Sequence, residues 1–257
     1  MPNHDAASYP SLAARHVLVT GGADGIGAAL VESFCRQHAV VTFFDIDDDL
    51  ANDTVERISA LGLSRPQYRR CDVTDTSALQ AEIALVVAEC GPIHVLINNA
   101  ANDERHNWAC VTSTEWDRLM DVNLKHHFFA IQAVAPGMAS SGGGSIINMS
   151  SISWQLGMGG MPCYVAAKSA IIGLTRSFAR DLGGLNIRVN TVLPGWIMTR
   201  RQIDLHKTPE GVTKLLASQC LKRELTPEDL APMVLFLASD DSRACTNQSF
   251  VVDGGWI

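Results

Sequence analysis

The chain has 257 residues, of which 47% are hydrophobic and 18% charged, and its formal net charge is −7. One large core is possible at this size, while the acidic balance and the lack of a basic stretch argue against nucleic acid as a partner. There is no apolar leader segment and no run of about 18 apolar residues, so we expect a cytoplasmic protein without a membrane partner.

Short apolar runs alternate with helical patterns along the chain. Strands are expected near residues 16–20, 40–45, 67–71, 93–98, 145–150, 187–193 and 249–253, with helices between them. Short right-handed crossovers predict an α/β fold of the Rossmann type, a doubly wound seven-stranded parallel sheet flanked by helices. Without repeats or internal linkers, we expect a single catalytic domain over 1–257 that begins with a polar tail at 1–11.

A glycine-rich turn comes directly after the first expected strand. The sequence Thr20-Gly-Gly-Ala-Asp-Gly-Ile-Gly27 lies between that strand and a helical pattern. Glycines at 21, 25 and 27 permit positive φ and close backbone approach, and a helix N-terminus offers free N–H groups to a pyrophosphate. Alone this is also an ordinary strand-to-helix turn, so its weight depends on the residues further along the chain.

An acidic residue ends the second expected strand and bears on cofactor choice. Asp45 lies 18 residues past Gly27, where a dinucleotide fold needs an acceptor for ribose hydroxyls. At about 4 Å and an effective dielectric near 20, it would repel the extra phosphate of NADP by about 4 kcal/mol. Residues 39–56 carry no Lys or Arg that would reverse this repulsion, so we predict NAD.

Tyr164 and Lys168 form the most informative pair of side chains. Their four-residue spacing puts the phenol and the ammonium on one face of a helix. An adjacent cation lowers a phenol's pKa, so we expect Tyr164 to work as a base near neutral pH.

These motifs together resemble the short-chain dehydrogenase/reductase family over nearly the whole chain. The glycine loop matches TGxxxGxG, Asp72 the adenine-contacting acid, and Asn98-Asn-Ala-Ala101 the NNAG stretch, with Ala101 where the family has glycine. That departure suggests a shifted backbone there. The resemblance implies a catalytic tetrad and a larger cofactor set: Asn123, Ser151, Tyr164 and Lys168 for catalysis; Gly21, Asp24, Gly25, Ile26, Gly27, Asp45, Ile46, Asp72, Val73, Asn98, Ala100, Tyr164, Lys168, Pro194, Gly195, Ile197 and Thr199 for the dinucleotide.

The resemblance also implies a role for each tetrad residue. Tyr164 would remove the substrate's hydroxyl proton, and Lys168 would lower the tyrosine pKa and bind ribose hydroxyls. Ser151 would hydrogen-bond the substrate oxygen, and Asn123 would hold a water that passes the proton to solvent.

Polar and aromatic residues after the fourth and fifth strands suggest a polyhydroxylated ligand. A narrower resemblance to bacterial aldose 1-dehydrogenases implies oxidation of an aldose such as L-arabinose, D-xylose or a related hexose to its lactone. The expected substrate contacts are Asn102, Asp103, His106, Ser151, Trp154, Gln155, Tyr164 and Trp196, under a lid at 196–222 that includes Arg201 and Gln202 and is irregular from 196 to 210. Packing is an equal explanation for Trp154 and Trp196.

Other interpretations stay open. The substrate could be another alcohol or ketone, such as a keto-acyl, steroid or sugar-acid compound; a non-catalytic NAD sensor and a glycine-loop methyltransferase are further alternatives. Seven scattered cysteines indicate reduced thiols, and no metal site is expected. His126 and His127 are predicted to lie at the surface or an interface. Family analogy implies a homotetramer.

Overall fold

A computed structural model describes residues 7–257. All strands of its seven-stranded sheet run parallel in the order β3-β2-β1-β4-β5-β6-β7. The strands are β1 (His16–Thr20), β2 (Val40–Asp45), β3 (Gln67–Arg70), β4 (Val95–Asn98), β5 (Gly144–Met149), β6 (Ile187–Pro194) and β7 (Ser249–Val252). The predicted doubly wound sheet is confirmed, with strand limits that differ by at most two residues.

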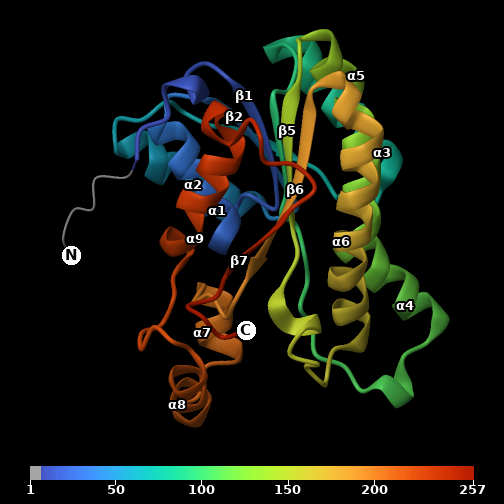
Figure 1. The fold of residues 1–257 in the computed structure, drawn as a ribbon, viewed down its shortest axis with the longest axis vertical. Helices are drawn as coiled ribbons and strands as arrows, with labels where there is room; N and C mark the ends of the chain where they lie inside the picture. The colour runs from blue at the N-terminus through green and yellow to red at the C-terminus, as the bar shows by residue number, and fades with distance from the viewer. Residues whose placement is uncertain (1–6) are drawn as a thin grey trace.

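Helices cover both faces of the sheet (Figure 1). They are α1 (Gly25–Arg36), α2 (Asp48–Ala60), α3 (Thr76–Cys90), α4 (Ser113–Met120), α5 (His126–Ser140), α6 (Pro162–Leu182), α7 (Arg200–Leu205), α8 (Pro209–Ser218) and α9 (Pro227–Ala238). Within residues 7–257, no helix combines the length and the apolar character that a membrane span requires.

Two hydrophobic cores lie on opposite faces of the sheet. The first packs α1, α2 and α9 against side chains such as Val17 and Val19, and the second packs α3, α5 and α6 against Leu18. Successive side chains of β1 thus alternate between the faces, as strand geometry requires. Both faces are buried, which explains the nearly continuous apolar strands.

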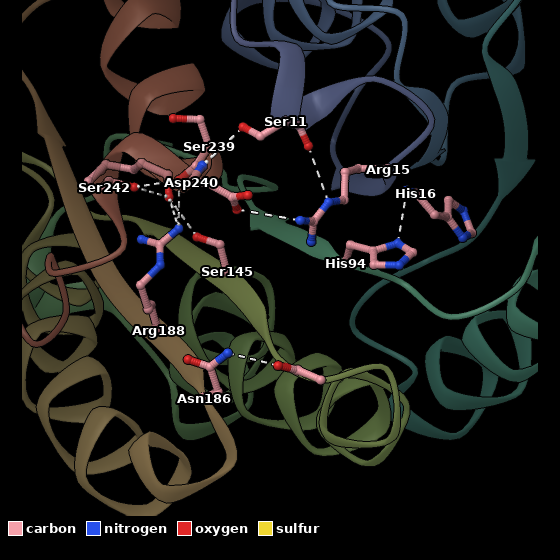
Figure 2. A network of polar contacts seen from close by, with 12 residues as sticks. Ser11, Arg15, His16, His94, Ser145, Asn186, Arg188, Ser239, Asp240 and Ser242 are labelled. Atoms are coloured by element: carbon pink, nitrogen blue, oxygen red, sulfur yellow. Dashed lines mark hydrogen bonds and ion pairs between the residues drawn. The ribbon is translucent and has the colours of Figure 1, made fainter.

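The amino ends of the strands carry a dense polar network (Figure 2). The guanidinium of Arg188, near the start of β6, donates to the carbonyl oxygens of Leu237 at 2.8 Å, Ser239 at 3.2 Å and Cys245 at 3.3 Å. The hydroxyl of Ser145 also donates to Leu237 O at 2.8 Å. The bonds to Leu237 and Ser239 satisfy carbonyls that the C-terminus of α9 leaves free, and the bond to Cys245 holds the segment that follows, so this network is structural.

Two segments contain helices that the sequence analysis did not predict. A short 3-10 helix, Pro10–Leu12, begins at the end of the polar tail predicted over 1–11, and its Leu12, just past that tail, is buried in the first core. Residues 1–6 of the tail lie outside the described ones. The expectation of an irregular stretch from Trp196 to Glu210 was wrong, because it contains α7 and the start of α8. Threonine side chains at 199 and 208 cap both helices, a signal that the sequence did contain.

The prediction for the histidine pair was also wrong. His126 and His127 are both fully buried, with ring centroids 4.4 Å apart. They begin α5, directly after a π-helical segment, Asp121–Lys125. The ring of His126 contacts the carbonyl oxygen of Ala100, and the ring of His127 contacts the side chain of Asn148. The two side chains thus point in different directions from the helix, and both directions lead into the protein interior.

Candidate functional site

A cleft of about 980 Å³ opens at the carboxyl ends of the strands. Loops after β1 to β6 all contribute to its wall. It lies beyond the carboxyl ends of the neighbouring strands β1 and β4, where the strand order reverses and where doubly wound sheets bind their ligands.

The glycine loop forms one wall, and its glycines are sterically required. A Cβ on Gly27 would lie 1.8 Å from the carbonyl oxygen of Gly21, and a Cβ on Gly21 would lie 2.8 Å from Ala100 Cα. Gly21 and Gly25 have φ of +67° and +55°. The loop leads directly into the 12-residue α1, whose N-terminus faces the cleft and suits a pyrophosphate.

Asp45 closes the nucleotide end of the cleft. Its carboxylate accepts hydrogen bonds from the backbone N–H groups of Ala23 at 2.9 Å and Ile46 at 2.8 Å, which link it to the glycine loop. These bonds fix a negative charge beside the expected ribose position. The glycine cradle, the helix N-terminus and this carboxylate together fit a nicotinamide dinucleotide.

Nearly all predicted cofactor residues line the cleft. Those on its wall are Gly21, Asp24, Gly25, Ile26, Gly27, Asp45, Ile46, Asp72, Val73, Ala100, Tyr164, Lys168, Pro194, Gly195, Ile197 and Thr199. Asn98 is not on the wall: it is fully buried and donates to Asn148 Oδ1 at 2.8 Å, whereas the next residue, Asn99, lines the cleft. Asn98 is the last residue of β4, and its side chain points into the protein interior and not into the cleft.

Ala101 needs no unusual backbone. Among the described residues, non-glycine positions with positive φ are Ala14, His38, Asn186 and Asn247. Ala101 lines the cleft and is not one of them, so its backbone conformation is one that alanine adopts without strain; the shift expected from the missing glycine stays a prediction.

The tetrad residues come from three elements. Ser151 follows β5, while Tyr164 and Lys168 lie one turn apart on α6. Lys168 Nζ lies 5.6 Å from the centroid of the Tyr164 ring and donates to Met149 O at 2.8 Å. All three side chains line the cleft.

Asn123 lies behind the wall. It is fully buried in the π-helical segment, where its Oδ1 accepts from Asn102 N at 2.9 Å and its Nδ2 donates to Asn102 O at 3.0 Å. This pairing anchors the loop after β4 to the helix. The structure therefore shows a loop-holding contact for Asn123.

Burial dominates the electrostatics of the tetrad. The pKa of Tyr164 is raised to about 12, chiefly by burial and also by Asp103, while Ser151 and Arg105 act in the opposite direction. Burial also lowers the pKa of Lys168 to about 7. The pKa of Tyr164 is therefore raised and not lowered as expected, because burial dominates, and the Lys168 ammonium donates its hydrogen bond to the carbonyl of Met149.

The predicted substrate residues divide into two groups. Asp103, Ser151, Tyr164 and Trp196 line the cleft; Asn102, His106, Trp154 and Gln155 do not. Asn102 is held by Asn123, and the ring of His106 faces Glu104 O at 3.0 Å and Cys163 N at 3.4 Å. Trp154 and Gln155 belong to a turn that meets the cleft through its other residues, Ser153 and Leu156.

A polar cluster joins the loop after β4 to α7. Asp103 accepts from Gln202 Nε2 at 2.8 Å and Arg201 Nε at 3.1 Å, and Gln202 Oε1 accepts from Trp196 Nε1 at 2.9 Å. These four residues all line the cleft, so the lid segment meets the opposite wall through hydrogen bonds.

Several wall residues were not named individually from the sequence: Arg105, Leu156, Met158, Met161, Lys214, Leu215, Ser218 and Trp256. The three residues from α8 lie inside the lid predicted at 196–222, and Arg105 and Leu156 lie in the stretches after the fourth and fifth strands that were expected to flank the pocket. No local signal marks Met158, Met161 or Trp256 as a wall residue, because only the tertiary fold brings them to the cleft. Among residues 7–257, no group of three His, Cys, Asp or Glu side chains is arranged to hold a metal ion.

Comparison with known proteins agrees with this geometry. The family model described as "Enoyl-(Acyl carrier protein) reductase" matches residues 21–257. A D-xylose 1-dehydrogenase of Caulobacter vibrioides is 46% identical over 98% of this chain and 99% of its own, and a "Probable galactose dehydrogenase" of Rhizobium meliloti is 47% identical over 97% and 98%.

A solved structure gives the same result at the level of the fold. The short-chain type dehydrogenase/reductase from Mycobacterium ulcerans superposes with a TM-score of 0.91 at 29% identity, over 96% of this chain and 90% of its own. Relatives across this range are named dehydrogenases and reductases, which act on CH–OH groups with nicotinamide dinucleotides. The chain therefore belongs to the short-chain dehydrogenase/reductase family, as an oxidoreductase.

Proposed function

We propose that this enzyme oxidises the anomeric hydroxyl of a cyclic aldose to the aldonolactone, with NAD as cofactor. The observation that carries the proposal is the pair of relatives named for D-xylose and galactose, which are 46% and 47% identical across essentially the whole chain. Relatives named for a keto-acyl or a steroid substrate are more distant, at 36% identity.

The substrate half of the cleft has chemistry that suits a sugar. The Asp103–Gln202–Trp196 chain offers carboxylate and amide groups beside an indole face. Sugar hydroxyls need paired donors and acceptors, and a sugar's C–H face packs on an aromatic ring. An extended acyl chain would displace water from these polar groups and offer no hydrogen bond in return, at a cost in binding.

The tetrad supplies the acid–base chemistry. NAD, when bound, supplies the hydride acceptor. Tyr164 takes the proton of the anomeric hydroxyl, and the Ser151 hydroxyl donates to the same oxygen. Burial raises the pKa of Tyr164, so at neutral pH the phenol is mostly protonated. The deprotonated base becomes more abundant at alkaline pH, and oxidation should accelerate there.

Asp45 supports NAD over NADP. Its carboxylate is held in place by the N–H groups of Ala23 and Ile46, so these bonds oppose its turning away from an added phosphate. The repulsion is reduced by solvent at this partly exposed position but keeps its sign.

A homotetramer in the cytoplasm completes the proposal. Phe128, on α5, is 41% exposed and packs at a tilt against Phe178 of α6, with ring centroids 5.3 Å apart. A partly exposed aromatic pair on two adjacent helices suits a subunit contact. Light scattering at micromolar concentration tests this, and a monomeric mass would contradict it.

The test of function is reduction of NAD and NADP by the purified enzyme with pentoses, 6-deoxyhexoses and hexoses. The matched control is the methyl glycoside of each active sugar, which blocks the anomeric hydroxyl and leaves every other hydroxyl free. We expect turnover of the free sugar with NAD and none of the glycoside. Turnover of both would mean a ring hydroxyl reacts, and turnover of simple secondary alcohols alone would overturn the sugar assignment.

A further inference from the structure

The loop after β4 crosses the floor of the cleft and touches the glycine loop. Thr20 Oγ1 accepts from the backbone N–H groups of Asn99 at 3.0 Å and Ala100 at 3.1 Å. Ala100 Cα lies so close to Gly21 that a Cβ on Gly21 would sit 2.8 Å from it. The position of Ala100 therefore determines the shape of the surface that receives the dinucleotide.

The carbonyl side of Ala100 is held by His126. The Nε2 atom of this buried ring lies 3.0 Å from Ala100 O. A carbonyl oxygen can only accept, so Nε2 carries the proton. Burial lowers the His126 pKa to about 3, which leaves the ring neutral with that single proton committed to the loop.

His127 provides a built-in comparison. It is equally buried and lies on the same helix, but its Nδ1 faces Asn148 Oδ1 at 3.2 Å, in the interior of the sheet layer. Neither histidine lines the cleft. One ring thus contacts the loop that forms the cleft floor, and the other contacts only the interior.

We propose that His126 is a positioning residue for the dinucleotide: its Nε2–H holds the Ala100 carbonyl, and thereby the loop of residues 99–102, against the glycine loop. Thr20 and His126 bind the N–H side and the carbonyl side of the same residue. Without the histidine donor the Ala100 carbonyl loses its partner, while Asn99 and Asn102 on either side stay bonded to the glycine loop and to Asn123. The peptide between these two anchors is then free to rotate, which changes the floor where Ala100 meets Gly21.

The test compares His126→Gln with His126→Met, two side chains of nearly equal size of which only glutamine can donate. The dissociation constants of NAD and NADP are measured by tryptophan fluorescence, since Trp196 and Trp256 line the cleft. We expect the Met variant to bind NAD at least about tenfold more weakly, or about 1.4 kcal/mol. The Gln variant should stay within about threefold of wild type.

A second readout needs no cofactor. Amide hydrogen exchange over residues 99–102 should accelerate in His126→Met and return toward wild type in His126→Gln. If the Met variant does not fold, His126→Asn replaces it, because its shorter amide falls short of the carbonyl, and the same criteria apply.

The control is His127→Met, which should lower the melting temperature and leave the NAD dissociation constant within about twofold. Equal weakening by His127→Met, or unchanged affinity and exchange in folded His126→Met, would overturn the proposal. Both dinucleotides are titrated so that failure of this proposal can be told apart from failure of the NAD assignment. If the assignment of NAD is wrong, the wild-type protein itself binds NADP more tightly than NAD.

Discussion

The two ends of the sheet use polar side chains in opposite ways. At the amino end, Arg188 and Ser145 donate to backbone carbonyls around the end of α9, and Arg15 pairs with Asp240 at 3.4 Å. At the carboxyl end, Ser151 and Tyr164 face an open cleft. Polar groups whose bonds are completed within the chain stabilise the fold, whereas groups left facing a cavity remain available to a ligand.

The largest effect should come from the carboxyl end. Tyr164→Phe removes the base, and we expect turnover to fall about 10³–10⁴-fold, within the usual range for general acid–base groups. Melting temperature and NAD affinity should stay close to wild type, because the phenol supports neither the core nor the glycine loop. Steady-state kinetics and fluorescence titration check this, and substantial residual turnover would refute the role of Tyr164.

At the amino end the expectation is reversed. Arg188→Met removes the guanidinium donor from three carbonyls, which keep other donors from Ser145, Ser242 and Asn190, and we expect the free energy of unfolding to fall by about 2 kcal/mol. Arg188 lies near the start of β6, about 20 Å along the strand from the cleft at its other end. At temperatures below the melting temperature, kcat/KM should therefore change less than about twofold. Urea unfolding and kinetics measure the two quantities, and a large kinetic effect with normal stability would contradict the division between the ends.

Acid should destabilise the fold through four histidines, two at the amino end of the sheet and two at the start of α5. The pKa values of His16, His94, His126 and His127 are all lowered, chiefly by burial. Each neutral ring contributes stability that is complete above the unfolded pKa of about 6.5 and is lost as the pH falls below it. For His126, with a folded pKa of about 3, the loss at pH 5 is about 2 kcal/mol.

Urea unfolding at pH 8 and pH 5 measures this loss. The His126→Gln variant is the control, and its stability should depend less steeply on pH. An unfolding free energy that does not change between the two pH values would contradict the neutral, buried state of these rings.

The smallest expected effect concerns cofactor choice. Asp45→Asn removes the charge and keeps one acceptor oxygen, which can stay with the Ala23 N–H of the glycine loop, while the N–H of Ile46 loses its acceptor. The ratio of NAD to NADP in kcat/KM should fall about tenfold, since solvent weakens the repulsion at this partly exposed site. An unchanged ratio would mean that residues other than Asp45 determine the choice between NAD and NADP.

The sequence by itself was enough to predict the sheet, the glycine loop, Asp45 and the Tyr164–Lys168 pair. These features depend on local signals: apolar runs between turns, glycines at positions with crowded backbone, and a four-residue helical spacing. Such signals are carried by residues close together in the sequence and need no knowledge of distant contacts.

Only the tertiary structure decided which polar residues face the cleft and which face the interior. His126 was expected at the surface and lies in the core, whereas Trp154 was expected at the substrate and lies off the wall. The direction of a side chain at a helix start or in a turn depends on the packing of segments far apart in sequence, here α5 against the loop after β4. A π-helical segment changes that direction further, and no spacing rule in the sequence announces it.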